Sequence, residues 1–421
     1  MALQLVRGFG EEVEDREGFE HAFLEHLRPF FSPGPLWVAR APGRLDVLGG
    51  IIDYAGGLVC EWPLAEAVWV ALQPRSDLRL RLATTASEPG IAPTVEMSLE
   101  DFYRQGRLLS YEEARLLFAE PSSRHWAAYV AGIFFVLLAE GKVARFPFGA
   151  TLGVVSRVPL GAGVASSAAL EVATMQAVCA AYGLSLEPLE KARLCQKAEN
   201  LVAGAPCGIM DQITALLGQK GALLLLLCQP YEVKGFFPLP SGVQVAGIHT
   251  QVKHSVGGSR YTSTRVGTFM GHRIIEEHLR RRAPWREEDP LEGYVCRISP
   301  EEFAKVYRRI LPEEMEGATF LRRYGGTRDP VTRVEPQRAY KVRSRVEHMV
   351  LEQARVERFL RALEAYERTR EPFFLRLAGK QMYASHWSYT KRCGLGAQEA
   401  DLLVRLAREE GEARGVYGAK I

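Results

Sequence analysis

The first third of the chain combines short apolar runs with longer amphipathic ones, and this mixture predicts both strands and helices. Apolar residues recur at helical spacing from Glu11 to Leu27, and the prolines from Pro29 onward end that helix. A dense apolar stretch from His125 to Glu140 is long enough for a buried helix. Short apolar or alternating runs predict strands at residues 36–41, 64–72 and 78–83.

The middle of the chain predicts a strand, a glycine-rich turn and a helix in direct succession. Residues 149–155 have the pattern of a strand, and residues 167–182 have the pattern of an alanine-rich helix. This order is typical of a phosphate-binding site.

Beyond Asp211 the pattern changes from strand-rich to helix-rich. We predict strands at 222–228 and 243–249, an insertion of short helices and turns at 284–336, and long helices at 265–282, 345–368 and 372–389. A chain of 421 residues is long enough for two domains, which we place at residues 1–215 and 216–421.

Composition narrows the class of protein. The net charge of +3, from 53 basic and 50 acidic residues, gives no reason to expect a nucleic-acid partner. The densest basic run, Arg280 to Arg282, has glutamates on both sides and is interpreted as a solvated helix end. The longest apolar run, Gly221 to Cys228, is too short to span a membrane. Seven scattered cysteines without a C-x-x-C pair predict a reducing, cytoplasmic environment, with neither a disulfide framework nor a zinc site.

Three segments carry candidate chemistry, and the first is the glycine-rich loop from Pro159 to Ala169. Gly161 and Gly163 allow close approach of the backbone to a ligand, and free N–H groups converge where the next helix begins. No Gly-Lys-Ser/Thr follows, so this is not a Walker A loop. Taken alone, the segment fits a tight turn capped by Ser166 equally well.

The second segment runs from Glu199 to Gln212. A glutamate ends a helical pattern, a loop broken by glycine and proline follows, and Asp211 precedes an apolar helix. A carboxylate at a helix N-terminus stays ionised and can accept a substrate hydroxyl proton or hold Mg²⁺. A plain N-cap role for Asp211 carries equal weight on this segment alone.

The third segment, Arg40 to Gly57, displays two arginines and two aspartates among turn-forming residues after a strand. Carboxylates accept pairs of sugar hydroxyls, and arginine neutralises a transferred phosphate. A salt-bridged surface turn is the alternative for this segment.

In their order, the three segments resemble the sugar-binding signature, phosphate loop and catalytic-aspartate segment of galactokinase-like GHMP kinases. The resemblance rests on Ala41-Pro42-Gly43-Arg44, on the Pro159 to Ala169 loop, and on Gly208-Ile209-Met210-Asp211-Gln212. Lys253-His254-Ser255, Tyr261, Arg265 and His386-Trp387-Ser388 also match family positions. The resemblance implies an α+β fold of two domains, a ribosomal S5-like N-terminal one and a ferredoxin-like C-terminal one, with the active site in the cleft between them.

The resemblance also implies the roles of individual residues and the substrates. It implies ATP, Mg²⁺ and a small sugar as ligands, with neither a membrane nor a nucleic-acid partner, and a monomer or weak dimer. Asp211 and Arg44 would be catalytic, Ser167 and Glu199 would bind the metal, and Asp53, Gly50, Ile51, Gly208 and Tyr261 would bind the sugar. The phosphates would lie on Pro159, Gly161, Ala162, Gly163, Val164, Ala165, Ser166 and Ser167.

Two positions separate this chain from ordinary galactokinases. Those enzymes read Gly-Glu-His-Thr-Asp-Tyr where this chain has Gly49-Gly50-Ile51-Ile52-Asp53-Tyr54. The Glu and His, implied contacts to the hexose 6-hydroxyl region, are replaced by Gly50 and Ile51, which suits a sugar that lacks the hydroxymethyl arm. Arg44-Leu45-Asp46-Val47 and His254-Ser255-Val256-Gly257-Gly258 also resemble plant L-arabinokinases.

We therefore predict a kinase that phosphorylates the anomeric hydroxyl of a sugar, with L-arabinose ahead of D-galactose. A non-catalytic sugar and ATP sensor, and a kinase for a non-sugar such as mevalonate or homoserine, are the rival hypotheses. The family's third glycine-rich motif would follow Gly415 to Ile421, so we expect the natural protein to continue past Ile421. The alternative is that the motif is absent, in which case full kinase activity is not expected.

Overall fold

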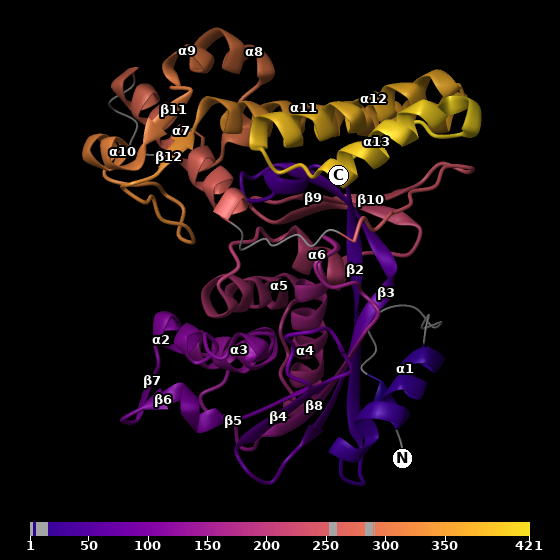
Figure 1. Cartoon of the computed structure of the whole chain (residues 1–421), viewed down its shortest axis with the longest axis vertical. Coiled ribbons are helices and arrows are strands. Elements are labelled where there is room, and N and C mark those ends of the chain that lie inside the picture. The colour runs from indigo at the N-terminus through magenta and orange to yellow at the C-terminus, as the bar shows by residue number, and fades with distance from the viewer. Residues whose placement is uncertain (1–2, 6–15, 252–258, 283–288, 290) are drawn as a thin grey trace. The chain divides into compact units, whose positions relative to one another are not determined.

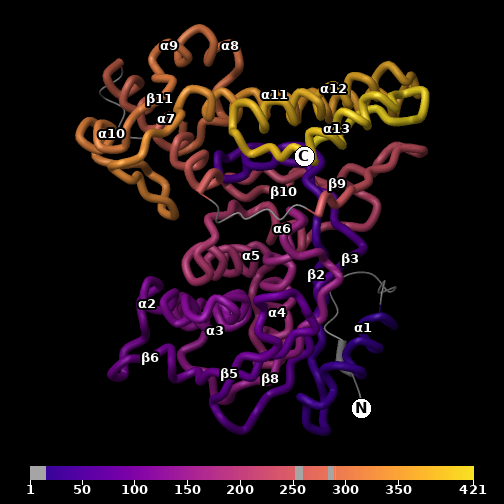
Figure 2. Tube along the Cα trace, in the orientation of Figure 1, coloured from indigo at the N-terminus to yellow at the C-terminus, as the bar shows by residue number. Residues whose placement is uncertain are grey.

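The computed structural model describes residues 3–5, 16–251, 259–282, 289 and 291–421, and these form two compact units (Figures 1 and 2). The first unit comprises Met1–Leu45 and Pro63–Lys220, and the second comprises Asp46–Trp62 and Gly221–Ile421. Strands β2 (Leu36–Leu48) and β3 (Leu58–Pro74) each contribute residues to both units.

The first unit is built on a mixed sheet with strand order β1-β2-β3-β8-β4-β5. β3 pairs antiparallel with β8, with Trp69 opposite Val155, and β4 pairs parallel with β8, with Leu82 opposite Leu152. The remaining strands of this sheet and the helices that flank it are β1 (Leu3–Leu5), β4 (Arg79–Thr84), β5 (Thr94–Ser98), β8 (Ala150–Ser156), α1 (Arg16–Ala22), α2 (Tyr111–Leu116), α3 (Ala127–Ala139), α4 (Ser166–Tyr182), α5 (Pro188–Lys197) and α6 (Met210–Leu217).

Helices α3, α4 and α5 lie on one side of this sheet and α1 on the other (Figure 1). On the α1 side the ring of Phe19 stacks on Trp69, with ring centroids 4.9 Å apart. Alternate residues of the strands, such as Val38 and Val155, complete that apolar layer. The alternation follows from the two-residue period of a strand, which turns every second side chain to the same face.

In the second unit, residues Leu58 to Glu61 of β3 pair antiparallel with β9 (Ala222–Leu227), which pairs with β10 (Glu232–Pro238). Helices α11 and α12 pack along one another (Figure 1). The helices and short strands of this unit are α7 (Ser259–Arg282), α8 (Pro300–Glu302), α9 (Arg308–Ile310), β11 (Glu314–Glu316), α10 (Gly317–Tyr324), β12 (Ala339–Lys341), α11 (Arg343–Thr369), α12 (Pro372–Ser388) and α13 (Gln398–Glu410).

Two sequence-based expectations differ from the structure. The strand predicted at 243–249 is wrong, because this segment pairs with no strand in the described part of the chain and its residues are mostly exposed. The division into units also differs from a single boundary at residue 215, because residues 46–62 belong to the second unit. There, Leu58 to Glu61 pair with β9, and the short 3-10 helix Gly50–Ile52 packs on α11.

All seven cysteines are buried, and none of them forms a disulfide. Among the described residues, no helix combines the length and apolar character needed to cross a lipid bilayer.

Candidate active site

The glycine-rich loop leads from β8 into α4. Several of its residues have positive φ, a backbone conformation that glycine favours. Gly161 and Gly163 have φ of 69° and 75°, and Ala165, with φ of 60°, occupies the position before the helix. No side chain caps the N-terminus of α4, so the alternative of a turn capped by Ser166 is wrong. The first N–H groups of α4 therefore remain suited to an anion.

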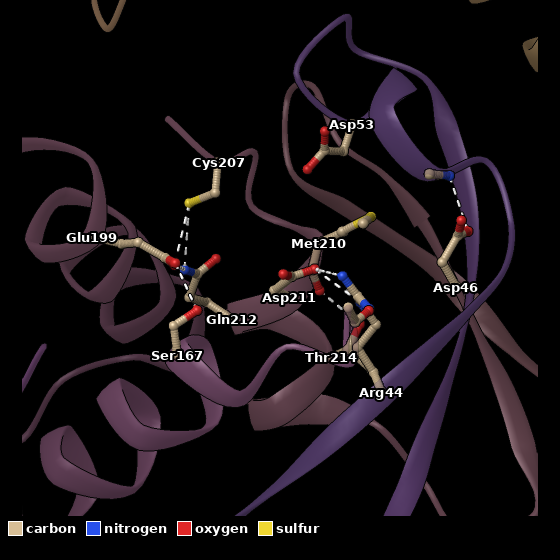
Figure 3. A network of polar contacts seen from close by, with 12 residues as sticks. Arg44, Asp46, Asp53, Ser167, Glu199, Cys207, Met210, Asp211, Gln212 and Thr214 are labelled. Atoms are coloured by element: carbon tan, nitrogen blue, oxygen red, sulfur yellow. Dashed lines mark hydrogen bonds and ion pairs between the residues drawn. The ribbon is translucent and has the colours of Figure 1, made fainter. Parts of the chain in front are cut away.

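Arg44 joins this loop to Asp211 (Figure 3). Its Nε and Nη2 lie 2.9 and 2.7 Å from Asp211 Oδ1, and its Nη1 donates to the carbonyl oxygen of Gly163 at 2.6 Å. The backbone N–H of Arg44 also donates to the carbonyl of Val164 at 3.1 Å. A Cβ on Gly43 would approach the Val164 oxygen to 2.8 Å, so the strand can run this close to the loop only with glycine there.

Asp211 is the second residue of α6, and its side chain is 16% exposed. Ile209 occupies the N-cap position, and no side chain caps this helix, so the simple N-cap alternative is wrong. The carboxylate is held by the Arg44 guanidinium through a charge-assisted contact, which fixes the position of the carboxylate. Gly208, predicted to bind the sugar, is buried and lies two positions before α6.

Ser167 and Glu199, the predicted metal ligands, are in direct contact (Figure 3). Ser167 Oγ donates to Glu199 Oε1 at 2.7 Å, and Gln212 Nε2 donates to Glu199 Oε2 at 2.6 Å. Cys207 Sγ lies 3.3 Å from the same Oε2. Burial raises the pKa of Glu199 to about 7, although the hydrogen bond from Ser167 works in the opposite direction.

Glu171 belongs to the same cluster, and the sequence analysis missed it. Its carboxylate is fully buried on α4, and Gln212 Nε2 donates to Glu171 Oε2 at 3.2 Å. Burial raises the pKa of Glu171 well above its usual range, and the charge of Glu199 raises it further. An acidic residue four positions after Ser167 on an otherwise uncharged helix was the signal that could have found it.

The cluster fits a magnesium ion that is shared with a nucleotide. Ser167 and Glu199 offer hard oxygen donors in direct contact, and the buried Glu171 Oε1 has no hydrogen-bond partner. Within the described ranges, no three His, Cys, Asp or Glu side chains form a metal-binding group. Mg²⁺ is commonly held by one or two protein oxygens together with substrate phosphates, so a complete protein cage is not required.

The loop that carries the predicted sugar contacts begins with a backbone held by Asp46. Gly50 has φ of 56°, and its N–H donates to Asp46 Oδ1 at 2.9 Å. A Cβ at Gly50 would approach Asp46 Oδ2 to 2.8 Å. Lys420 Nζ also pairs with the Asp46 carboxylate and donates to its carbonyl oxygen at 3.0 Å.

The remaining predicted sugar contacts lie in the same unit as this loop. Ile51 is buried, and Asp53 is buried with its Oδ1 accepting a hydrogen bond from the Tyr54 N–H at 2.6 Å. The ring of Tyr54 meets that of Tyr261 edge to face, with centroids 6.0 Å apart. Of the other family positions, His386 Nε2 lies 3.2 Å from Asp401 Oδ1, and Lys253, His254 and Ser255 fall outside the described residues, as do Val256, Gly257 and Gly258.

The fold and these segments match known families. Residues 128–219 match the family described as GHMP kinases N terminal domain, and residues 25–74 match the galactokinase galactose-binding signature. A galactokinase of Streptomyces coelicolor is 31% identical over 72% of this chain and 73% of its own length. The chain belongs to the galactokinase-like GHMP kinases.

Two further comparisons refine this placement. The L-arabinokinase of Arabidopsis thaliana is 38% identical over 92% of this chain, although the chain spans only 41% of that relative's length. The crystal structure of Lactococcus lactis galactokinase complexed with galactose aligns over 94% of this chain and 85% of its own, with a TM-score of 0.68 at 19% identity. The second likeness establishes the α+β GHMP kinase fold.

Proposed function

We propose that the protein transfers the γ-phosphoryl group of ATP to the anomeric hydroxyl of a monosaccharide, and that L-arabinose is the preferred sugar. D-Galactose is the second candidate, because galactokinases are also among the relatives. The observation that carries the proposal is the double contact of Arg44 with Asp211 and with the Gly163 carbonyl. One guanidinium thereby joins the proposed proton acceptor to the proposed phosphate loop.

In this proposal, each group of residues has a separate role in phosphoryl transfer. The N–H groups at the start of α4 bind phosphate oxygens, and Asp211 orients the sugar hydroxyl and accepts its proton. Arg44 holds the Asp211 carboxylate in place and neutralises charge on the transferred group. Because the transition state of phosphoryl transfer is loose, positioning and charge contribute more than a strong base.

We propose that Ser167 and Glu199 hold Mg²⁺, with Glu171 and Gln212 fixing the Glu199 carboxylate. A bound magnesium ion would neutralise negative charge on the nucleotide phosphates. The raised pKa of Glu199 fits this role, because a cation would compensate the cost of a buried carboxylate.

The preference for a pentose follows from the loop after Arg44. The positive φ of Gly50 and the nearness of Asp46 leave no room for the galactokinase glutamate in this loop conformation. Ile51 supplies an apolar side chain where galactokinases have histidine. A site without those polar groups gains nothing from a 6-hydroxyl, whereas Asp53 retains an acceptor for the ring hydroxyls.

The test is ADP release by the purified chain with L-arabinose, D-galactose and D-glucuronate. We expect kcat/KM to be highest for L-arabinose. A tenfold preference for galactose would reject the pentose argument but not the kinase. Sugar binding without ADP formation, in the presence of Mg²⁺ and ATP, would instead indicate a sensor.

We further propose a reducing compartment, in agreement with a cytoplasmic location, because the seven cysteines are buried and form no disulfide with one another. We also propose that the protein is a monomer or a weak dimer. Its molar mass in solution, measured by light scattering, tests this.

A further inference from the structure

Asp329, which lies outside the three recognised segments, forms a buried ion pair with Arg265 of α7. Arg265 Nε and Nη2 donate to the two carboxylate oxygens of Asp329, each at 2.8 Å. The Arg265 and Asp329 side chains are only 6% and 0% exposed. This forked arrangement fixes both the place and the plane of the guanidinium.

The Asp329 carboxylate is itself held by its own loop. It accepts hydrogen bonds from the backbone N–H groups of Val331 and Thr332, at 3.1 and 3.3 Å, and from Thr332 Oγ1 at 2.5 Å. Burial alone would raise the pKa of Asp329, but the contact with Arg265 and these donors lower it. Asp329 is therefore a rigid, ionised anchor.

The guanidinium that Asp329 fixes lies against the proposed sugar contacts. It sits 5.2 Å from the ring centroid of Tyr54, whose N–H donates to Asp53, and 5.7 Å from that of Phe269. Burial alone would lower the pKa of Arg265, but Asp329 raises it, and the charge of the neighbouring Asp53 adds to this. Arg265 thus connects Asp329 to Tyr54, and through the Tyr54 N–H to Asp53.

A buried ion pair contributes little to the free energy of unfolding, because desolvation of the two charges offsets much of their attraction. Orientation is the better explanation for this one, since the fixed guanidinium lies against Tyr54, whose N–H donates to the buried Asp53. We propose that Asp329 is a positioning residue for the sugar: it fixes Arg265 against Tyr54, whose N–H holds Asp53, and so sets the geometry of sugar binding. Without Asp329, the Arg265 guanidinium would lose the contacts that fix its plane, and its position against Tyr54 would change.

This inference rests on the proposed sugar-kinase function. The test is to measure sugar binding by calorimetry, and the KM values for sugar and ATP, for the wild-type chain and for Asp329→Asn. We expect the variant to bind L-arabinose about tenfold more weakly, with the KM for ATP changed less than about twofold. Thr332→Val removes one hydrogen bond to the anchor without changing charge, so we expect a smaller loss in the same direction.

Asp289→Asn is the matched control, because Asp289 is also buried and pairs with His272 of the same helix at 2.9 Å. If Asp329→Asn and its control lower thermal stability alike and change sugar and ATP binding equally, the pair is only structural and the inference is wrong. Unchanged sugar affinity in both Asp329→Asn and Thr332→Val overturns it as well. If the wild-type chain binds no sugar, the proposed function fails first, and this inference fails with it.

Discussion

The carboxylate of Asp46 lies where the side chain of a larger residue at position 50 would begin. A Cβ on Gly50 would meet Asp46 Oδ2 at 2.8 Å, and the backbone there has φ of 56°. The same carboxylate accepts a hydrogen bond from the Gly50 N–H and pairs with Lys420. The identity of residue 50 and the course of the proposed sugar loop are therefore coupled.

Gly50→Ala tests this coupling. We expect it to lower the free energy of unfolding by about 1–2 kcal/mol through backbone strain, with a further loss from displacement of Asp46. The KM for sugar should rise as the loop moves. Denaturant unfolding and steady-state kinetics measure the two effects.

The control for that substitution is Gly106→Ala. Gly106 has φ of 77°, yet a Cβ there would meet no atom within 4 Å. The difference between the two variants isolates the contact with Asp46 from the backbone strain. Equal stability losses and an unchanged sugar KM would contradict the coupling.

Arg44→Lys tests the link between the phosphate loop and Asp211. Lysine keeps the charge but cannot reach Asp211 and the Gly163 carbonyl together, so we expect kcat to fall by about a hundredfold or more. Arg40→Lys is the control, because Arg40 lies on the same strand and donates to the Ala65 carbonyl at 2.6 Å. A similar kcat in both variants would show that Arg44 has no specific role in phosphoryl transfer.

Asp211→Asn preserves the shape of the side chain but removes the proton acceptor. We expect kcat to fall by about two to four orders of magnitude, while nucleotide binding changes little. Steady-state kinetics, combined with nucleotide binding measured by fluorescence, would separate the two quantities. Turnover close to the wild-type rate would reject the assigned role.

The buried Glu199 predicts a pH dependence of stability. Its pKa of about 7 in the folded protein is above the ordinary value of 4.5, so the folded state binds this proton more tightly than the unfolded state. The resulting stabilisation is complete below pH 4.5 and is lost as the pH rises through 7. It amounts to roughly 3 kcal/mol for this group at about 1.4 kcal/mol per pKa unit.

Glu199→Gln should therefore flatten the dependence of the unfolding free energy on pH between about 4.5 and 7. Glu187→Gln, at an exposed position, serves as the control and should leave the curve parallel to that of the wild type. Denaturant unfolding at several pH values, without divalent cations, provides the measurement. A curve for Glu199→Gln that parallels the wild type would show that this carboxylate does not titrate as described.

Local patterns in the sequence were enough to predict the segments of the candidate site and the long helices. The three segments around Arg44, the Pro159 to Ala169 loop and Asp211 depend on glycines, turn residues and helix starts, whose preferences act over a few neighbouring positions. The long helices α3, α4, α11 and α12 were also predicted close to their observed bounds, because apolar periodicity over many residues is a strong local signal.

Only the tertiary structure decided which distant residues meet. Residues 243–249 have the composition of a strand but find no partner in the described chain, and residues 46–62 join the second unit through pairing with β9. Glu171 and Asp329 carry no motif, and they acquire their roles through Gln212 and Arg265, which are 41 and 64 positions away. Strand pairing and buried charge pairs are long-range interactions, and their energies depend on neighbours that no local pattern specifies.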